Sequence, residues 1–292
     1  MPVPVENPLT TAKIELGRKL FFDEWLSRDG TISCASCHHP DKAFTDGRAL
    51  PVGIDGQSGR RNVPSLLNSA YGKSMFWDGR AASLEKQALH PLTSPAEMGN
   101  TLEAVLARVR ENPAYRRLSE AAFGTAAMTP GQIAQALASF QRTLVAGNSP
   151  YDRQLLTRDD SVLSEEARRG FALFRGKARC AHCHEGPLFT DQKFHNTGVN
   201  WGKKPMDLGR YEHTGKEDDK GKFKTPTLRN LLLTAPYMHD GSLKTLDAVI
   251  DFYDRGGSAH PNLDPSIKSL SLSGQEKTNL VSFLRALSIK EQ

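Results

Sequence analysis

All four cysteines of the 292-residue chain fall in two five-residue motifs, CASCH at positions 34–38 and CAHCH at positions 180–184. Each is a C-x-x-C-H sequence, the pattern that attaches a c-type haem. Two thiols at this spacing bond the vinyl groups of the porphyrin, and the histidine that follows is held under the iron as its proximal ligand. The sequence therefore predicts two covalently bound haem groups. Their attachment residues are Cys34, Cys37, His38, Cys180, Cys183 and His184.

Two other chemistries use cysteine pairs of this kind. Zinc is held by four cysteines or by cysteines with histidines, and a C-x-x-C pair can exchange between dithiol and disulfide. Both pairs here are followed directly by histidine, and no cysteine lies outside them, so haem is favoured over either alternative. A secreted disulfide scaffold needs a much higher cysteine density in a shorter chain and is excluded.

The haem motifs lie in longer stretches that resemble each other. Leu-Phe precedes and Phe-Thr-Asp follows each motif, and VPSLLNSAYGKSMFWDG matches TPTLRNLLLTAPYMHDG further along the chain, so that Trp77 aligns with His239. Such self-similarity indicates an internal duplication. We predict a mainly α fold of two cytochrome-c-like haem domains, residues 1–147 and 148–292, with long loops around the haems.

Helix start signals are clear at two positions. Thr129 and Gln132 form the pattern of a capping box, and Ser273 and Glu276 repeat it near the end of the chain. Further helices are predicted near residues 10–22, 83–90, 101–111, 164–175 and 245–254. The glycine- and proline-rich loops expected to wrap the haems cover residues 41–65 and 185–226.

The charge and hydropathy patterns exclude some classes of partner. Lysine and arginine total 38 against 33 aspartate and glutamate, and the net charge of +5 is spread without a block of like charges. Nucleic-acid binding is therefore not expected. No apolar run reaches about 18 residues, so no membrane span is predicted. The first residues lack signal-peptide features, but c-type haems are attached outside the cytoplasm, so we expect a periplasmic protein whose leader peptide is absent from this sequence.

The duplication draws attention to Tyr253. Pro91 lies fourteen residues after Trp77, and Tyr253 lies fourteen residues after His239, so one half offers a phenol where the other offers a ring that cannot ligate iron. Tyr253 also ends an apolar stripe of helical spacing. That periodicity alone favours core packing over iron ligation.

The longest motifs resemble one protein family. RNVPSLLN, MFWDGRAASLEKQ and TPTLRNLLLTAPYMHDGSLKTL, together with both C-x-x-C-H sites, are similar to the bacterial dihaem cytochrome c peroxidases and their relative MauG, the methylamine-dehydrogenase maturation enzyme. The likeness covers nearly the whole chain. In that family peroxide reacts at the N-terminal haem, and the C-terminal haem takes in or stores electrons. The resemblance makes His38 the proximal ligand of the reactive haem and His184 that of the electron-transfer haem.

The same resemblance implies catalytic residues beside the first haem. Trp77 matches a tryptophan that relays electrons between the haems, although on its own it would be read as a core aromatic residue. Glu97 matches the catalytic glutamate, Gln87 matches the distal glutamine, and Pro91 would line the same pocket. A positioned carboxyl group can carry a proton from one peroxide oxygen to the other during heterolysis. Without the family match, Glu97 would be read as a solvated charge near a helix start.

The family also holds a calcium ion between its haems. By this resemblance, the calcium ligands correspond to Asn62, Thr234 and the carbonyl group of Pro236. Oxygen donors of this kind suit Ca²⁺, but each of the three residues also fits an ordinary turn. A bound calcium ion is therefore an expectation from the family and not from the residues alone.

One departure from the family pattern concerns the reactive haem. Many dihaem peroxidases cap this haem at rest with a histidine from the loop after the first motif. This chain has no histidine between His39 and His90, and Ile54 falls near the capping position. His39 is too close to His38 to reach the opposite haem face. The reactive haem is thus predicted to be open to peroxide in its resting ferric state.

A second departure concerns the sixth ligand of the C-terminal haem. The peroxidases usually supply a methionine there, whereas no methionine of this chain follows Met238. The resemblance to MauG assigns the position to Tyr253, with Met238, Met206 and His239 as alternatives. A phenolate stabilises ferric and higher iron states and lowers the reduction potential relative to a thioether. The diferric protein is therefore expected to react with peroxide directly.

These predictions together describe an oxidoreductase that uses hydrogen peroxide. By resemblance to MauG, the two oxidising equivalents would be shared as two Fe(IV) centres coupled through Trp77. The electrons would come from a small donor protein, which makes the chain a peroxidase, or from a residue such as tryptophan on a partner protein; the peroxidase is favoured. A pure electron-transfer cytochrome is disfavoured, because it would have no use for Glu97 and Gln87 beside an open iron position.

Overall fold

The computed structural model describes residues 1–289, and the chain divides into two compact units. The first unit comprises residues 1–46, 50–76 and 81–145, and the second comprises residues 47–49, 77–80 and those from 146 onward. The predicted boundary, after residue 147, lies two residues beyond the observed one, after residue 145. The prediction also placed the segments 47–49 and 77–80 in the first domain, whereas the structure places them in the second unit. The tryptophan segment is therefore part of the C-terminal unit's fold.

Both units are mainly helical, as predicted. The α-helices of the first unit are α1 (Thr11–Phe22), α2 (Leu84–Ala88), α3 (His90–Thr93), α4 (Leu102–Glu111), α5 (Pro113–Phe123) and α6 (Pro130–Arg142). Those of the second are α7 (Pro150–Thr157), α8 (Glu165–Arg175), α9 (Tyr211–Thr214), α10 (Leu246–Asp254) and α11 (Gly274–Arg285). Two short strands, β1 (Phe194–His195) and β2 (Phe223–Lys224), pair antiparallel in the second unit. Across residues 1–289, no helix is long and apolar enough to cross a membrane.

Single-turn 3₁₀ helices occupy much of the remaining chain. They are η1 (Glu24–Leu26), η2 (Cys34–Ser36), η3 (Pro40–Lys42), η4 (Ile54–Gly56), η5 (Ser69–Tyr71), η6 (Asp160–Val162), η7 (Cys180–His182), η8 (Glu217–Asp219) and η9 (Leu231–Leu233). Both C-x-x-C-H motifs begin with such a turn. Because a 3₁₀ turn is tighter than an α-helical turn, it sets the direction in which the cysteine and histidine side chains leave the backbone.

The predicted capping boxes are present at the starts of α6 and α11. The Thr129 hydroxyl accepts a hydrogen bond from the Gln132 amide, and the Gln132 side chain accepts one from the Thr129 amide at 2.9 Å. Ser273 and Glu276 make the same reciprocal pair, with 2.7 Å for the return bond. These bonds satisfy amide groups that a helix start leaves free, and so determine where both helices begin.

Two helices of eight or more residues lie outside the predicted ranges, and the single-turn α9 falls within the predicted loop 185–226. α5 starts at Asn112, whose side chain accepts the Ala114 amide, and α7 starts at a capping box of Ser149 and Asp152. Both carry proline at the first helical position, which is a recognised start signal. None of the residues of α7 is buried, so the apolar periodicity that identifies a core helix is missing there.

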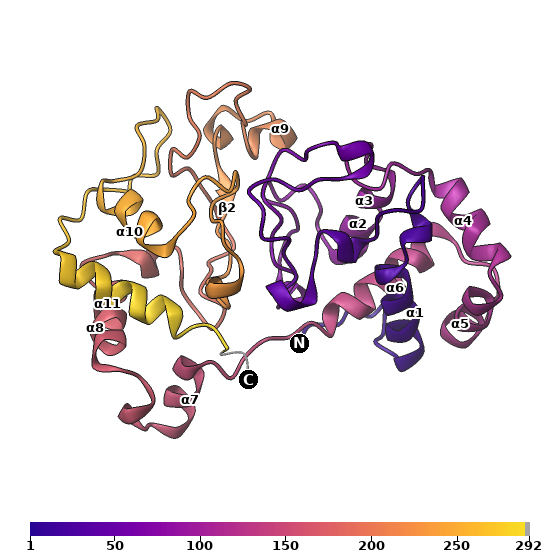
Figure 1. Ribbon diagram of the computed structural model, residues 1–292, viewed down its shortest axis with the longest axis horizontal. Helices are drawn as coiled ribbons and strands as arrows, with labels where there is room; N and C mark the ends of the chain where they lie inside the picture. The colour runs from indigo at the N-terminus through magenta and orange to yellow at the C-terminus, as the bar shows by residue number, and fades with distance from the viewer. Residues whose placement is uncertain (290–292) are drawn as a thin grey trace. The chain divides into compact units, whose positions relative to one another are not determined.

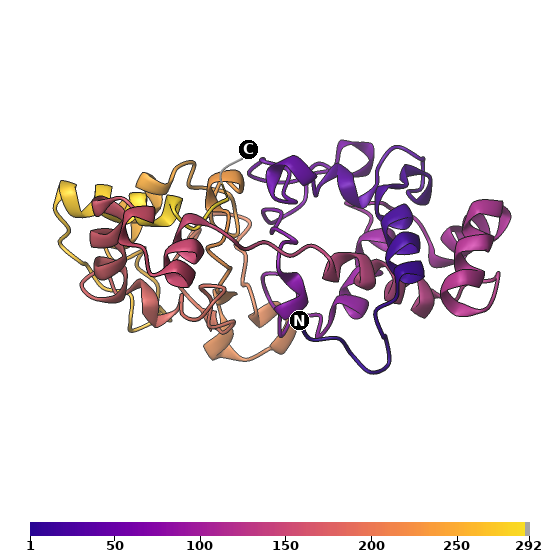
Figure 2. The ribbon, with the colours of Figure 1, turned by 90° about the horizontal axis from the view of Figure 1, so that it is seen from below.

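Each unit contains one helix pair in close contact (Figure 1). A Cβ atom added to Gly17 of α1 would lie 1.9 Å from the carbonyl oxygen of Ala136 in α6. A Cβ atom on Gly170 of α8 would lie 1.9 Å from the carbonyl oxygen of Asn279 in α11. The indigo α1 against α6 and the yellow α11 against α8 can also be followed from below (Figure 2). The repeated glycine contact is consistent with the proposed duplication.

Replacing either glycine by alanine is expected to destabilise its unit. The added methyl group has to displace backbone, so the free energy of unfolding should fall by more than about 2 kcal/mol for Gly17→Ala and for Gly170→Ala. Gly274→Ala is the control, because no atom lies within 4 Å of its added Cβ. Chemical denaturation followed by circular dichroism measures all three. Equal stability of Gly17→Ala and the control would show that α1 and α6 do not touch at this point.

The helix pairs also carry the cores against which the haem motifs pack. In the first unit, Leu16, Phe21 and Leu137 are buried in one cluster, and Cys34 lies against it. In the second unit, Phe174 and Phe283 stack edge to face with ring centroids 5.1 Å apart, and Cys180 lies against their cluster. Each motif is therefore held by the core of its own unit.

Candidate functional site

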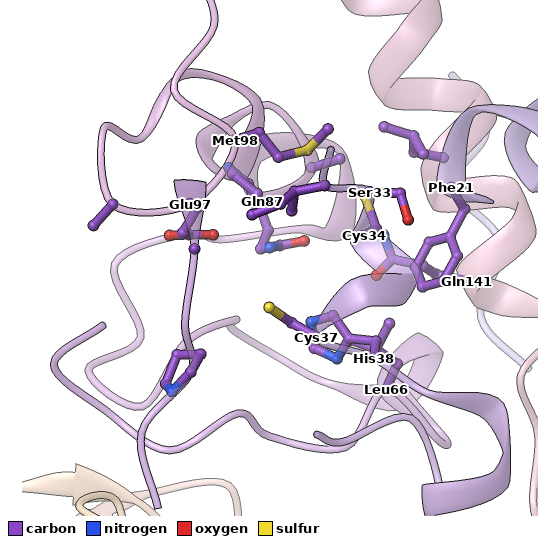
Figure 3. A pocket seen from close by; sticks show the side chains of 17 residues that line it. Phe21, Ser33, Cys34, Cys37, His38, Leu66, Gln87, Glu97, Met98 and Gln141 are labelled. Carbon is purple, nitrogen blue, oxygen red and sulfur yellow. The ribbon is translucent and has the colours of Figure 1, made fainter. Parts of the chain in front are cut away.

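The first haem motif forms one wall of a cavity that is partly open to solvent (Figure 3). Cys37 and His38 lie on one side of it in this view, and Gln87 and Glu97 lie across from them. The remaining lining is largely apolar; it includes Phe21, Ile32, Leu66, Pro91, Met98 and Leu137. The structure thus gathers three residues that the family match identified, Gln87, Pro91 and Glu97, around a single C-x-x-C-H motif.

Both motif histidines are oriented for iron ligation. Nδ1 of His38 lies 2.8 Å from the carbonyl oxygen of Phe44, and Nδ1 of His184 lies 2.9 Å from that of Phe189. A carbonyl oxygen can only accept, so Nδ1 carries the hydrogen and Nε2 keeps its lone pair. Burial lowers the pKa of both rings, and a neutral imidazole is the form that binds a metal.

The residues opposite His38 are held by the backbone of two loops. The carbonyl oxygen of Glu97 accepts a hydrogen bond from the Ile54 amide at 2.9 Å, and the Met98 amide donates to Pro91 at 3.1 Å. Ile54, which falls near the capping position of related enzymes, is fully buried. Gln87 extends from α2 towards the same space. These bonds fix the Glu97 backbone at the edge of the cavity.

The first thiol of each motif does not have the character of a redox or zinc-binding cysteine. Burial, followed by the charges of Glu97 and Cys37, raises the pKa of Cys34 to about 12. Burial also raises the pKa of Cys180 to about 12. Reactive thiols and zinc ligands are thiolates, which form where the pKa is depressed. The thiols of Cys34 and Cys180 are therefore better suited to a permanent covalent link, which removes the ionisable hydrogen.

The cavity fits a haem by its donor set and by one unsatisfied polar atom. Two thiols and an imidazole with a free Nε2 lie at its wall, and apolar side chains border the rest. Gln141 of α6 is 5% exposed, and its side-chain oxygen has no hydrogen-bond partner in the described chain. Buried polar atoms are nearly always paired. The Gln141 oxygen therefore indicates a missing hydrogen-bond donor, either a polar group of a bound ligand or a water molecule beside that ligand.

Tyr253 lies near the end of α10, close to the second haem motif. Burial and the charges of Cys180 and Cys183 raise the pKa of its phenol, whereas a hydrogen bond with the Thr197 side chain lowers it. The phenol is therefore within electrostatic range of both cysteines. Ile250, one turn earlier, is buried in the second core, but Tyr253 is only partly buried. The position is compatible with both predicted interpretations, packing and ligation.

Trp77 and His239, which align in sequence, have different surroundings. The Trp77 carbonyl accepts a hydrogen bond from the Lys224 amide of β2 at 2.7 Å, which ties the segment 77–80 to the second unit. His239 is buried, and its ring stacks on Phe223 with centroids 3.5 Å apart and an angle of 12°.

The three expected calcium ligands are distributed over both units. Asn62 is buried in the first unit, whereas Thr234 and Pro236 belong to the second. The Thr234 hydroxyl lies 3.4 Å from the Leu231 carbonyl oxygen, a long contact within its own turn. The calcium site stays a prediction.

A partly buried ion-pair cluster beside Cys183 has no counterpart in the sequence predictions. His195 lies 2.8 Å from Asp191 through Nε2 and 2.6 Å from Asp264 through Nδ1. Hydrogen bonds with Cys183, Asp264 and Asp191 raise the pKa of His195 to about 10. One donor atom from each of Cys183, Asp191 and His195 lies within 4.8 Å of the other two. Asp264 is 69 residues from His195, and no local spacing links them.

Comparison with known proteins gives close matches over most of the chain. A family model described as di-haem cytochrome c peroxidase matches residues 11–161. The chain is 44% identical to the methylamine utilization protein MauG of Methylorubrum extorquens, over 98% of this chain and 81% of the relative. It is 38% identical to cytochrome-c peroxidase IdrP1 of Denitromonas iodatirespirans, over 100% of this chain and 85% of the relative. The crystal structure of a MauG-like protein associated with microbial copper homeostasis superposes with a TM-score of 0.91 at 37% identity, over 99% of this chain and 94% of that one.

Proposed function

We propose that this chain reduces hydrogen peroxide at the haem of its first unit. The chain belongs to the di-haem cytochrome c peroxidase family and is an oxidoreductase of the dihaem peroxidase type. The oxidising equivalents are shared with the haem of the second unit through Trp77. Electrons from a small donor protein then return both haems to the resting state. Because c-type haems are attached outside the cytoplasm, the periplasm is the proposed location.

One observation carries this proposal: Gln87 and Glu97 face His38 across the cavity (Figure 3). A haem bound to Cys34 and Cys37 supplies the redox chemistry there. His38 would hold its iron, and the Glu97 carboxyl group lies across the cavity from His38, where it could act on bound peroxide. Glu97 can accept a proton from one peroxide oxygen and return it to the other, which leaves as water. The Gln87 amide can donate a hydrogen bond that orients the substrate.

The first haem is proposed to be open at rest. Of the described residues that line the cavity, His38 alone carries an imidazole. Ile54 is fully buried, with its amide bonded to Glu97, so no capping side chain extends from this position. A peroxidase whose haem is already open requires no prior reduction to admit its substrate.

Tyr253 is the proposed sixth ligand of the second haem. It lies within electrostatic range of Cys180 and Cys183, whereas the alternative His239 is stacked on Phe223 and Met206 is 37% exposed. The proposed calcium ion, held by Asn62, Thr234 and Pro236, completes the cofactor set. Its role would be structural, since Ca²⁺ has no redox chemistry of its own.

A second candidate function is the oxidation of a residue on a partner protein. The 44% identity to MauG and a tyrosine near the second haem motif favour it, because an electron-rich phenolate ligand makes a haem easier to oxidise and harder to reduce. In that case the protein substrate, and not a small electron donor, supplies the two electrons. The two candidates are distinguished by mixing the protein with hydrogen peroxide and a reduced small c-type cytochrome. Repeated turnover of peroxide supports the peroxidase, whereas a single reaction of the haems with peroxide, without turnover, supports the second candidate.

The proposed function is tested by adding hydrogen peroxide to the diferric holoprotein and recording optical and EPR spectra. We expect a high-spin ferric signal from the first haem before peroxide is added, and loss of both ferric signals together afterwards. No prior reduction should be needed. A protein that stays unchanged until an electron is supplied would contradict the proposed open state.

A further inference from the structure

Tyr115, which is buried, and Asp23, which is partly buried, form a hydrogen-bonded pair in the first unit. The hydroxyl of Tyr115, in α5, donates a hydrogen bond of 2.6 Å to Oδ2 of Asp23, the residue that follows α1. Tyr115 is 1% exposed. The second carboxylate oxygen of Asp23 accepts the Trp25 amide at 3.0 Å, so the carboxylate is fixed in place. The phenol therefore has a base already in contact with its hydrogen.

This pair lies in the core that supports the first haem motif. Tyr115 belongs to the same buried cluster as Phe21 and Leu137, both of which line the cavity, and Cys34 packs against that cluster. Burial, then the hydrogen bond and charge of Asp23, and then the charge of Cys34 raise the pKa of Tyr115. Cys34, whose thiol would bond the porphyrin, therefore packs against the same core that contains the phenol.

A buried tyrosine can be oxidised only if its proton has somewhere to go. Removing an electron alone would leave a cationic phenol in an apolar core, which costs several kcal/mol. Asp23 removes this cost because it can take the proton along an existing short hydrogen bond. Lys19 is the other charged group facing the pair; its Nζ lies 4.8 Å from the Tyr115 ring centroid and 3.9 Å from Asp23.

We propose that Tyr115 and Asp23 are a redox-active pair that can supply one electron to the peroxide-oxidised haem of the first unit. Tyr115 gives one electron to the haem, and its hydroxyl proton moves to the Asp23 carboxylate. The products are a neutral phenoxyl radical and a neutral carboxylic acid, and the step reverses when an electron arrives. Hydrogen peroxide is the ultimate oxidant, so the inference rests on the proposed function.

The second unit provides a matched comparison. Tyr237 also donates its hydroxyl hydrogen, at 2.9 Å, but its acceptor is the carbonyl oxygen of Leu231. An amide carbonyl can accept a hydrogen bond but is far too weak a base to take the proton. Tyr237 is therefore expected to remain reduced under conditions that oxidise Tyr115, which makes Tyr237→Phe the control for loss of a tyrosine.

The test is freeze-quench EPR of the diferric holoprotein mixed with hydrogen peroxide in the absence of any reductant. A tyrosyl radical signal is expected, and it should narrow when the protein is produced with ring-deuterated tyrosine. The signal should be lost in Tyr115→Phe and in Asp23→Asn, and kept in Tyr237→Phe. In Asp23→Asn the amide oxygen can still accept the Trp25 amide and the NH2 group can donate to the Tyr115 oxygen, but the side chain cannot take the proton, so this variant also decides the question if Tyr115→Phe fails to fold.

The two ferric haem signals in the same samples separate the possible failures. If both disappear but no deuterium-sensitive radical forms, or if the radical persists in Tyr115→Phe or in Asp23→Asn, the redox pair is refuted and the proposed function stands. If the ferric signals never change with peroxide, the proposed function fails, and the inference that rests on it fails as well.

Discussion

Replacing Glu97 by glutamine is expected to slow the reaction of the diferric protein with hydrogen peroxide by about 10²- to 10⁴-fold, the range over which a positioned acid–base group contributes to catalysis. The carboxyl group lies across the cavity from His38, and its backbone is held by the Ile54 amide. Glutamine preserves the size of the side chain and its ability to donate or accept hydrogen bonds, but it cannot carry a proton between the two oxygens. Stopped-flow absorption of the haem bands measures the rate.

Glu103→Gln is the control for this substitution. Glu103 is exposed in the first turn of α4 and does not line the cavity, so its replacement removes the same charge without removing the proposed proton carrier. The optical spectrum of the resting protein should be the same in both variants. If Glu97→Gln reacts as fast as Glu103→Gln, another group moves the proton and the role proposed for Glu97 is wrong.

The surroundings of the first haem could be predicted because their signals are local in sequence. Cys34, Cys37 and His38 fall within five consecutive positions. Gln87, Pro91 and Glu97 fall within eleven residues, so α2, α3 and the loop that follows bring them to a single wall. The capping boxes of α6 and α11 are equally local, since N-cap and N3 residues interact directly. Such features depend on few contacts with the rest of the chain.

Other features depend on contacts that no spacing encodes. Asp23 and Tyr115 are 92 residues apart, and the unsatisfied Gln141 oxygen is apparent only once α6 lies against the cavity. The assignment of residues 77–80 to the second unit likewise rests on a backbone bond between Trp77 and β2. Periodicity identifies helix faces but not their partners, because the same apolar stripe can pack against any complementary surface.

The two units use the same attachment chemistry with different surroundings. In both, a backbone carbonyl orients the histidine by binding Nδ1, so the proximal sides should differ little. The difference must come from the opposite sides, where the first unit presents Glu97 and Gln87 and the second presents Tyr253 near its cysteines. An acid beside an open iron position suits bond cleavage, and an anionic ligand suits storage of an oxidising equivalent.

Replacing Tyr253 by phenylalanine is therefore expected to have the largest effect in the second unit. The variant should lose the low-spin ferric EPR signal of the second haem, because phenylalanine has no atom that binds iron. Peroxide should still react at the first haem, but the equivalents should no longer be shared between the haems. Tyr253→Met should instead keep a six-coordinate haem and raise its reduction potential by on the order of 100 mV, since a thioether stabilises ferrous iron relative to a phenolate.

Tyr211→Phe is the control, because Tyr211 is a partly buried tyrosine of the same unit whose ring lies under Lys220. Redox titration and EPR of the three holoproteins distinguish the two interpretations of Tyr253. If Tyr253→Phe keeps the low-spin signal and potential of the control, the phenol only packs in α10 and the ligand is another residue. If the signal is lost in Tyr253→Phe alone, the haem of the second unit depends on a phenolate, and the direct reaction of the diferric protein with peroxide follows from that ligand.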